Sequence, residues 1–188
     1  LNNYVMIGLR TLVLNANYMP VSIFPLHTIV VEDAITKVFN NTVHVVFDHD
    51  RKVAHPTLDM NWPSVIARNR NSRPRESVRF ARESLYYRDH GMCQYCGTTM
   101  NMKQTTYDHV IPRSKGGTHT WDNVVMSCSK CNNVKADRMP RDSFVPIQKP
   151  YKPTYWQLIA NRRKFPIWVD CPSWIDFLGE WEAEIYTR

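Results

Sequence analysis

The 188-residue sequence has no long hydrophobic run and no recognisable secretory signal. No apolar stretch approaches the roughly 20 residues that an α-helix needs to cross a bilayer, which excludes a helical membrane protein. The five cysteines are an odd number, and four of them form two Cys-x2-Cys pairs. This usage argues against the disulfide framework of a small secreted protein. We therefore expect a protein of the reducing cytoplasm that has no membrane partner.

Low-complexity tracts and internal repeats are also missing, and glycine occurs only six times. A chain of this length is typical of about one domain and can bury a core without a metal for overall stability. A bound metal is therefore expected to stabilise only one region of the chain.

Positive charge is concentrated in the middle of the chain. Residues 68–152 contain 16 lysines and arginines against seven acidic residues, a net charge of +9, whereas the segments on either side each have a net charge of −1. A confined basic field is typical of proteins that bind a polyanion such as nucleic acid. A basic surface that only improves solubility is the alternative interpretation.

We expect four segments along the chain. They are an N-terminal extension of mixed strands and helix (1–67), a basic linker with a short helix (68–91), a motif region (92–139), and a proline-rich wrap with C-terminal helices (140–188).

The N-terminal extension should contain two strands, a helix and a hairpin. In order, the expected elements are a strand at 11–14, a turn at 17–20, a strand at 21–24, a helix after Thr28, and a hairpin with its turn at 48–51 and a return at 52–54. Asp48-His49-Asp50 could also ligate a metal, although acidic and polar residues are what a tight turn selects.

The later segments have their own boundary signals. Gly91 should end a helix that starts near Glu83, a further helix should begin near Trp121, and the second cysteine pair should open another. Thr154 and Gln157 form a capping box, which predicts a helix to about residue 163. A last helix is expected from about Ser173, with its aromatic and apolar stripe in the core.

The two cysteine pairs are Cys93-x2-Cys96 and Cys128-x2-Cys131, separated by residues 97–127. Each such turn presents two thiolates, and two turns supply the four soft ligands of a closed structural zinc site. Two alternatives to zinc binding remain. A redox site would need only one Cys-x2-Cys pair, and the cysteines could also be buried free thiols. Cys171 lies outside both pairs and should be a buried thiol.

Between the cysteine pairs lie residues suited to hydrolysis of a phosphodiester. Neighbouring residues on a strand point to opposite faces, so Asp108 can bind a hard cation while His109 meets a water molecule. Asn132 follows the second pair directly and offers a carbonyl oxygen to Mg²⁺ or Mn²⁺. A surface histidine with no catalytic role is the simpler interpretation of His109 taken alone.

The whole motif resembles the HNH endonucleases, which have the ββα-metal fold. The resemblance is carried by Asp108-His109-Val110-Ile111-Pro112-Arg113-Ser114-Lys115-Gly116-Gly117, Trp121-Asp122-Asn123 and Cys128-x2-Cys131-Asn132-x2-Lys135. It implies an α+β protein whose residues 92–139 form the ββα-metal core with a four-cysteine zinc. Weaker similarity in residues 12–20 is to bacterial and phage members, which implies a bacterial or phage-infected cell.

The resemblance also implies roles for individual residues. His109 would be the general base, Asn123 would brace the loop that carries it, and Asp108 and Asn132 would hold one Mg²⁺ or Mn²⁺. Asn133 is the alternative to Asn132. Many HNH proteins have a histidine at this last position, so the Asp-His-Asn-Asn form leaves the choice of metal open.

The expected substrate is DNA, most simply double-stranded, cleaved by a monomer or homodimer. Basic residues expected to contact its phosphates are Arg68, Arg70, Arg73, Arg75, Arg113, Lys115, Lys130 and Lys135. RNA is an alternative substrate. A zinc-dependent binding module without cleavage, or a structural protein, would keep the cysteines and the charge without needing Asp108, His109 and Asn132 together.

Overall fold

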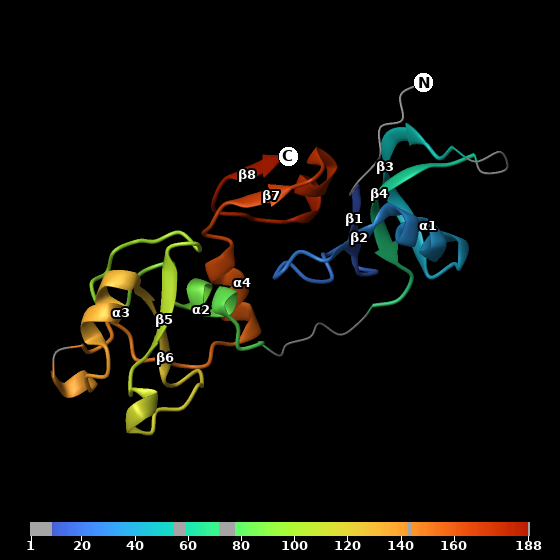
Figure 1. Ribbon diagram of the computed structural model, residues 1–188. Helices are drawn as coiled ribbons and strands as arrows, with labels where there is room; N and C mark the ends of the chain where they lie inside the picture. Colours follow the sequence, from blue (N-terminus) through green and yellow to red (C-terminus); the bar gives the residue numbers. More distant parts are fainter. Residues whose placement is uncertain (1–8, 55–58, 72–77, 143, 188) are drawn as a thin grey trace. The chain divides into compact units, whose positions relative to one another are not determined.

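The computed structural model describes residues 9–54, 59–71, 78–142 and 144–187, and the chain divides into two compact units (Figure 1). Unit 1 combines Leu1–Arg75 with Arg163–Arg188, and unit 2 is Glu76–Arg162. No helix within the described ranges is long and apolar enough to cross a membrane.

Unit 1 is built on a four-stranded sheet with the order β2-β1-β4-β3, in which β1 and β4 are parallel and the other pairs antiparallel. Its elements are β1 (Arg10–Leu14), β2 (Thr28–Val30), α1 (Val31–Phe39), β3 (Val43–Lys52), β4 (Asn61–Arg68), β7 (Ile167–Val169), the 3₁₀ helix Pro172–Phe177 and β8 (Ile185–Thr187). Strands β7 and β8 form a separate parallel pair.

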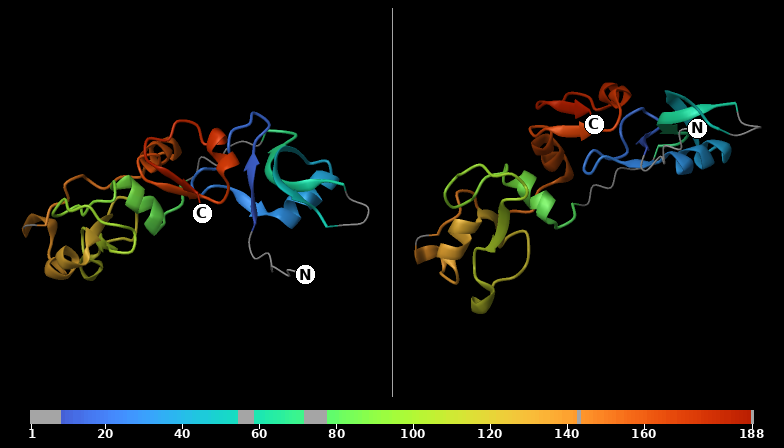
Figure 2. Two further views of the ribbon diagram at one scale, coloured as in Figure 1. Left: turned by 90° about the horizontal axis from the view of Figure 1, so that it is seen from above. Right: turned by 45° about the horizontal axis from the view of Figure 1, so that its top comes forward.

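Each face of the four-stranded sheet carries a small core. Val13 and Ile66 pack with Ala34 of α1, which lies against the sheet in both views of Figure 2. Leu12 and Val65 alternate to the other face and pack with Trp174 from the far end of the chain. The Trp174 indole also donates a 2.9 Å hydrogen bond to the Ser64 carbonyl. The C-terminal segment is therefore part of the N-terminal fold.

Several predicted elements of unit 1 differ in the structure. The strand at 11–14 and the helix are present, but the helix begins after Val30 and not at Thr28. The turn predicted at 48–51 is wrong, because β3 runs through it with irregular pairing to β4. The helix predicted from Ser173 is a 3₁₀ turn that ends before Gly179, whose φ of +69° is unfavourable for continuing a helix.

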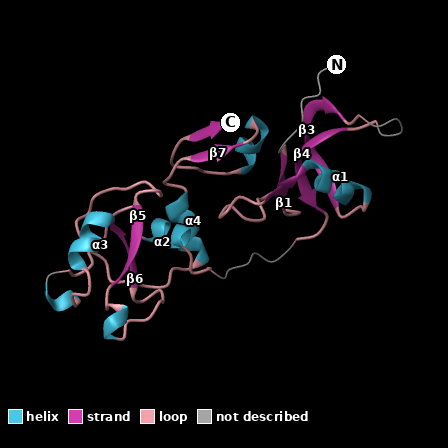
Figure 3. Ribbon diagram, in the orientation of Figure 1, coloured by secondary structure: helices cyan, strands magenta, loops and turns pink. Residues whose placement is uncertain are grey.

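Unit 2 contains a ββα core. Its elements are α2 (Arg82–Arg88), β5 (Thr105–His109), the 3₁₀ turn Arg113–Lys115, β6 (Val124–Cys128), α3 (Ser129–Lys135), the 3₁₀ turn Pro140–Asp142 and α4 (Tyr155–Arg162). Strands β5 and β6 are antiparallel, with α3 on one side and α2 and α4 on the other (Figure 3). The α+β class and the ββα arrangement predicted from the sequence are confirmed. The helix predicted near Trp121 is instead a turn leading into β6.

A buried ion pair connects the elements of unit 2. Arg88, at the end of α2, has no exposed surface and binds both carboxylate oxygens of Asp89, at 2.7 and 2.9 Å. The guanidinium also donates to the carbonyls of Trp121, Val124 and Tyr151. Because these carbonyls lie at the start of β6 and in the proline-rich segment, the pair ties α2 to both.

The predicted capping box at the start of α4 is present. The Thr154 amide donates to the Gln157 side chain at 2.8 Å, and the Gln157 amide donates to the Thr154 hydroxyl at 3.2 Å. These reciprocal bonds satisfy two amides that the first turn of a helix leaves without partners.

Candidate functional site

The four cysteines predicted to bind zinc come together in unit 2. The Sγ atoms of Cys93, Cys96, Cys128 and Cys131 all lie within 4.8 Å of one another. The first pair lies in a tight turn closed by the Gly97 amide, which donates to the Cys93 carbonyl at 2.9 Å. The second pair opens α3, where the Cys131 amide donates to the Cys128 sulfur at 3.3 Å.

This cluster fits a structural metal. Four sulfur donors at such spacing suit a tetrahedral zinc ion, and no position is left for a reacting water. Hydrogen bonding with Thr98 lowers the pKa of Cys96 to about 6, which favours the thiolate that a metal binds. Burial has the opposite effect on Cys93 and raises its pKa.

Asp108, predicted as a ligand of the catalytic metal, is buried at the end of β5 on the side of α3. Its Oδ2 accepts a 2.5 Å hydrogen bond from the Tyr95 hydroxyl and lies 2.7 Å from Nζ of Lys135. Burial, together with the bond to Asp108, raises the pKa of Tyr95 and keeps this donor protonated. Oδ1 makes no hydrogen bond to any described residue, so one carboxylate oxygen is left for a cation.

Lys135 does not have the phosphate-binding role predicted for it. The side chain has no exposed surface, and its ammonium donates to the His109 carbonyl at 2.7 Å as well as pairing with Asp108. Because a phosphate contact needs access to solvent, the structure contradicts that prediction. Lys135 instead joins the end of β5 to α3 through these two contacts.

His109 points away from Asp108, as strand alternation predicts. Its Nε2 lies 3.0 Å from Nδ1 of His119, and the Tyr107 ring lies beside both imidazoles. Burial, followed by the positive fields of His119 and Arg113, lowers the pKa of His109 below its usual 6.5. The neutral imidazole is therefore favoured near pH 7.

Asn123 braces the loop between the two strands. Its side chain accepts a 2.8 Å hydrogen bond from the Ile111 amide and donates to the carbonyls of Ile111 and Thr118, at 3.0 and 2.9 Å. Gly117 packs at the same point, where an added Cβ would lie 1.7 Å from the Ile111 oxygen. The loop that follows His109 is thus held by side-chain bonds and by close backbone packing.

Asn132 and Asn133 face different surroundings on α3. The Asn132 amide donates to the Thr106 hydroxyl at 3.3 Å, on the face of β5 that also carries Asp108. Asn133 is exposed. Of the two, Asn132 is therefore the one whose side chain contacts the face of β5 that carries Asp108.

The other predicted phosphate contacts are divided between the units. Arg113, Lys115 and Lys130 are exposed in unit 2, where Lys115 lies 3.7 Å from Asp137. Arg68 and Arg70 belong to unit 1, and Arg73 and Arg75 lie outside the described residues.

Sequence reasoning did not identify Tyr95 and His119 as members of the site. Tyr95 lies between two cysteine ligands, and its position there gave no sign of a bond to Asp108. His119 lies in the loop between β5 and β6. Its position ten residues after His109, beyond the paired glycines, was the only signal that the loop returns to the strand.

Comparison with known proteins finds two family models that match separate parts of the chain. Residues 93–144 match the family described as HNH endonuclease, and residues 11–76 match the family described as HNH endonuclease-associated, N-terminal domain. The chain is also similar to the CRISPR-associated endonuclease Cas9 of Corynebacterium diphtheriae, with 35% identity over 51 residues. That match spans 27% of this chain and 5% of the relative.

Proposed function

We propose that the chain hydrolyses phosphodiester bonds of double-stranded DNA, with His109 as the general base. The proposal is supported by the match of residues 93–144 to the HNH endonuclease family. The observation that carries the proposal concerns two adjacent residues of β5, Asp108 and His109, whose side chains have different partners. The free Oδ1 of Asp108 and the imidazole of His109 leave opposite faces of β5.

The proposed proton acceptor is Nδ1 of His109. Nε2 is hydrogen-bonded to His119, whereas Nδ1 makes no hydrogen bond to any described residue. In the neutral tautomer with the proton on Nε2, His109 donates to Nδ1 of His119 and keeps the Nδ1 lone pair for water. His119 is then a positioning residue that selects the reactive tautomer.

Asp108 and Asn132 are proposed to hold one Mg²⁺ or Mn²⁺, which when bound supplies positive charge to the scissile phosphate. Lys135 and Tyr95 orient the Asp108 carboxylate through the other oxygen. The four cysteines are proposed to bind a structural Zn²⁺, which fixes the start of α3 and thereby the position of Asn132.

The test is nicking of supercoiled plasmid by the full chain with Mg²⁺ or Mn²⁺. We expect His109→Ala to lower the nicking rate by at least about 10²-fold, the usual contribution of a positioned base. His49→Ala removes a different histidine, one from unit 1, and should leave the rate unchanged. A wild-type chain that binds DNA with steep salt dependence but nicks neither DNA nor RNA would show a binding module.

A further inference from the structure

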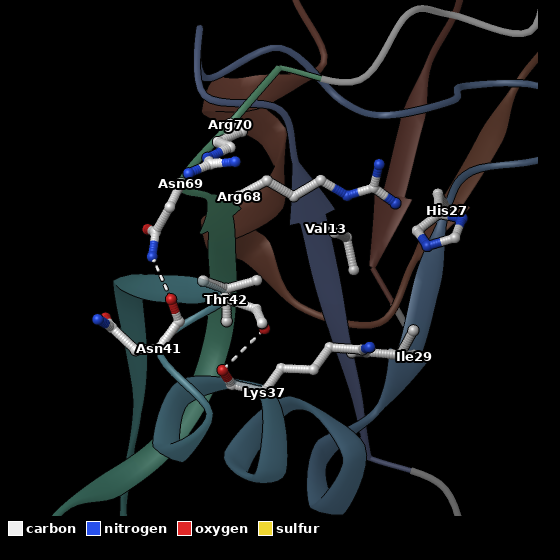
Figure 4. A pocket seen from close by; sticks show the side chains of 10 residues that line it. Val13, His27, Ile29, Lys37, Asn41, Thr42, Arg68, Asn69 and Arg70 are labelled. Carbon is white, nitrogen blue, oxygen red and sulfur yellow. Dashed lines mark hydrogen bonds between the residues drawn. The ribbon is translucent and has the colours of Figure 1, made fainter.

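Unit 1 contains a pocket of about 780 Å³ that the proposed cleavage site does not use (Figure 4). It lies where the start of β2, the last turn of α1 and the end of β4 meet. The volume falls within the roughly 300–1,000 Å³ typical of small-molecule sites and is several times what a bare phosphate needs.

Cationic groups reach the pocket from two elements. Lys37 extends from α1, and Arg68 and Arg70 come from the end of β4 and the residues after it (Figure 4). None of the described residues that line the pocket is acidic. The lining is therefore suited to an anion.

The pKa of His27 is affected by two of the same cationic groups. Burial is the largest cause that lowers the pKa of its imidazole, and the charges of Arg68, Lys37 and Arg10 lower it further. The three cations therefore lie close enough to His27 to oppose its protonation.

The remaining lining offers polar groups beside an apolar wall. Asn69 is held in place by bonds to the Asn41 carbonyl at 2.8 Å and to His44 at 3.0 Å. The side-chain amide of Asn41 points away from the other lining residues (Figure 4). Val13 and Ile29 supply an apolar surface on the side of the pocket that also carries His27.

We propose that this pocket binds a nucleotide, with its phosphate on Lys37, Arg68 and Arg70 and its base against the apolar surface of Val13 and Ile29. Cationic groups beside an apolar surface match the phosphate and the base of a nucleotide better than they match a simple anion. The nucleotide is either one unit of a nucleic-acid strand or a free nucleotide. The inference goes beyond the proposed function, since binding here requires no cleavage.

Binding is measured on the full chain without added Mg²⁺ or Mn²⁺, using adenosine 5′-monophosphate, adenosine and a fluorescent ten-nucleotide DNA strand as probes. The test variant is Lys37→Gln with Arg70→Gln, which changes two exposed side chains. Its matched control is Lys52→Gln with Lys164→Gln, which removes the same charge from exposed positions of unit 1 outside the pocket. Thermal unfolding of both variants checks that each remains folded.

We expect the test variant to weaken binding of the monophosphate at least about tenfold, as for loss of a charge-assisted hydrogen bond, and the control to bind as the wild type does. If the test variant loses affinity for the DNA strand alone, the occupant of the pocket is a unit of nucleic acid. Equal loss in both variants, adenosine binding as tightly as its monophosphate, or no binding of either phosphorylated probe to the wild type would overturn the inference. A chain that binds these probes but does not nick DNA contradicts the proposed function alone.

Discussion

Lys135 and Asp108 form an ion pair of 2.7 Å in which the lysine side chain is fully buried and the carboxylate is only 8% exposed. The pair joins the last strand residue before His109 to the last turn of α3. Because it uses Oδ2 alone, it holds the carboxylate in place without occupying the oxygen proposed for the metal.

Replacing Lys135 by Met should lower the free energy of unfolding by about 3–5 kcal/mol, because Asp108 would keep a buried charge without its partner. Chemical denaturation measures this loss. Lys115→Met is the control, since Lys115 and Asp137 form an exposed pair at 3.7 Å, for which a change within about 1 kcal/mol is expected. Similar losses in the two variants would contradict the structural role of Lys135.

Replacing Asn123 by Asp should disrupt the loop after His109 while keeping the side-chain shape. A carboxylate can still accept from the Ile111 amide, but it cannot donate to the carbonyls of Ile111 and Thr118. We expect a loss of about 2–4 kcal/mol in stability, together with slower plasmid nicking.

Asn101→Asp provides the comparison for this change. The Asn101 side chain only accepts, from the Gln104 amide at 3.0 Å, so an aspartate can replace it. Nicking by this variant should match that of the wild type. If Asn123→Asp nicks DNA equally well, the bracing role is wrong.

Replacing Cys96 by Ser should release the metal and lower the unfolding temperature of unit 2. Elemental analysis should find one zinc per wild-type chain and substantially less in the variant. Cys171→Ser is the matched change in a cysteine outside the cluster and should keep the zinc. Equal zinc content and equal unfolding temperatures for Cys96→Ser and the wild type would count against a structural zinc.

Replacing Lys37 by Gln should raise the pKa of His27 towards 6.5, because one of the cations that opposes its protonation is removed. In the wild type the folded-state pKa lies below the unfolded value, so the unfolded state takes up the proton first. Stability is therefore full above about pH 6.5 and falls as the pH drops below it. NMR titration of His27 should show the rise for Lys37→Gln and none for Lys164→Gln.

Local signals predicted the elements that lie closest to the site. The capping box of Thr154 and Gln157 and the cysteine pair that opens α3 act over three or four residues, and both are present. The Asp-His pair also needs only strand alternation to separate its two side chains. These features depend little on the rest of the fold.

Features that depend on distant partners could not be predicted. Pro63 argues against a central strand, yet β4 is central. Pro63 is tolerated because it lies where the pairing with β3 is irregular and before the pairing with β1 at Val65. In the sequence, Lys135 is indistinguishable from the other basic residues of its segment. It is buried beside Asp108 because α3 packs on β5. The burial of Arg88 likewise depends on distant partners, the stretch of Trp121 and Val124 and the more distant Tyr151.

The division of unit 1 into two pieces of chain has a consequence for biosynthesis. Residues 76–162 emerge from the ribosome as one continuous stretch, so the cysteine cluster and the ββα core can assemble as soon as that stretch is free. The core on one face of the unit 1 sheet is completed later, because Trp174, which packs there beside Ser64, follows residues 76–162 in the chain. A nascent or truncated chain lacking residues 163–188 would thus carry a complete ββα core while one face of the unit 1 sheet is still uncovered.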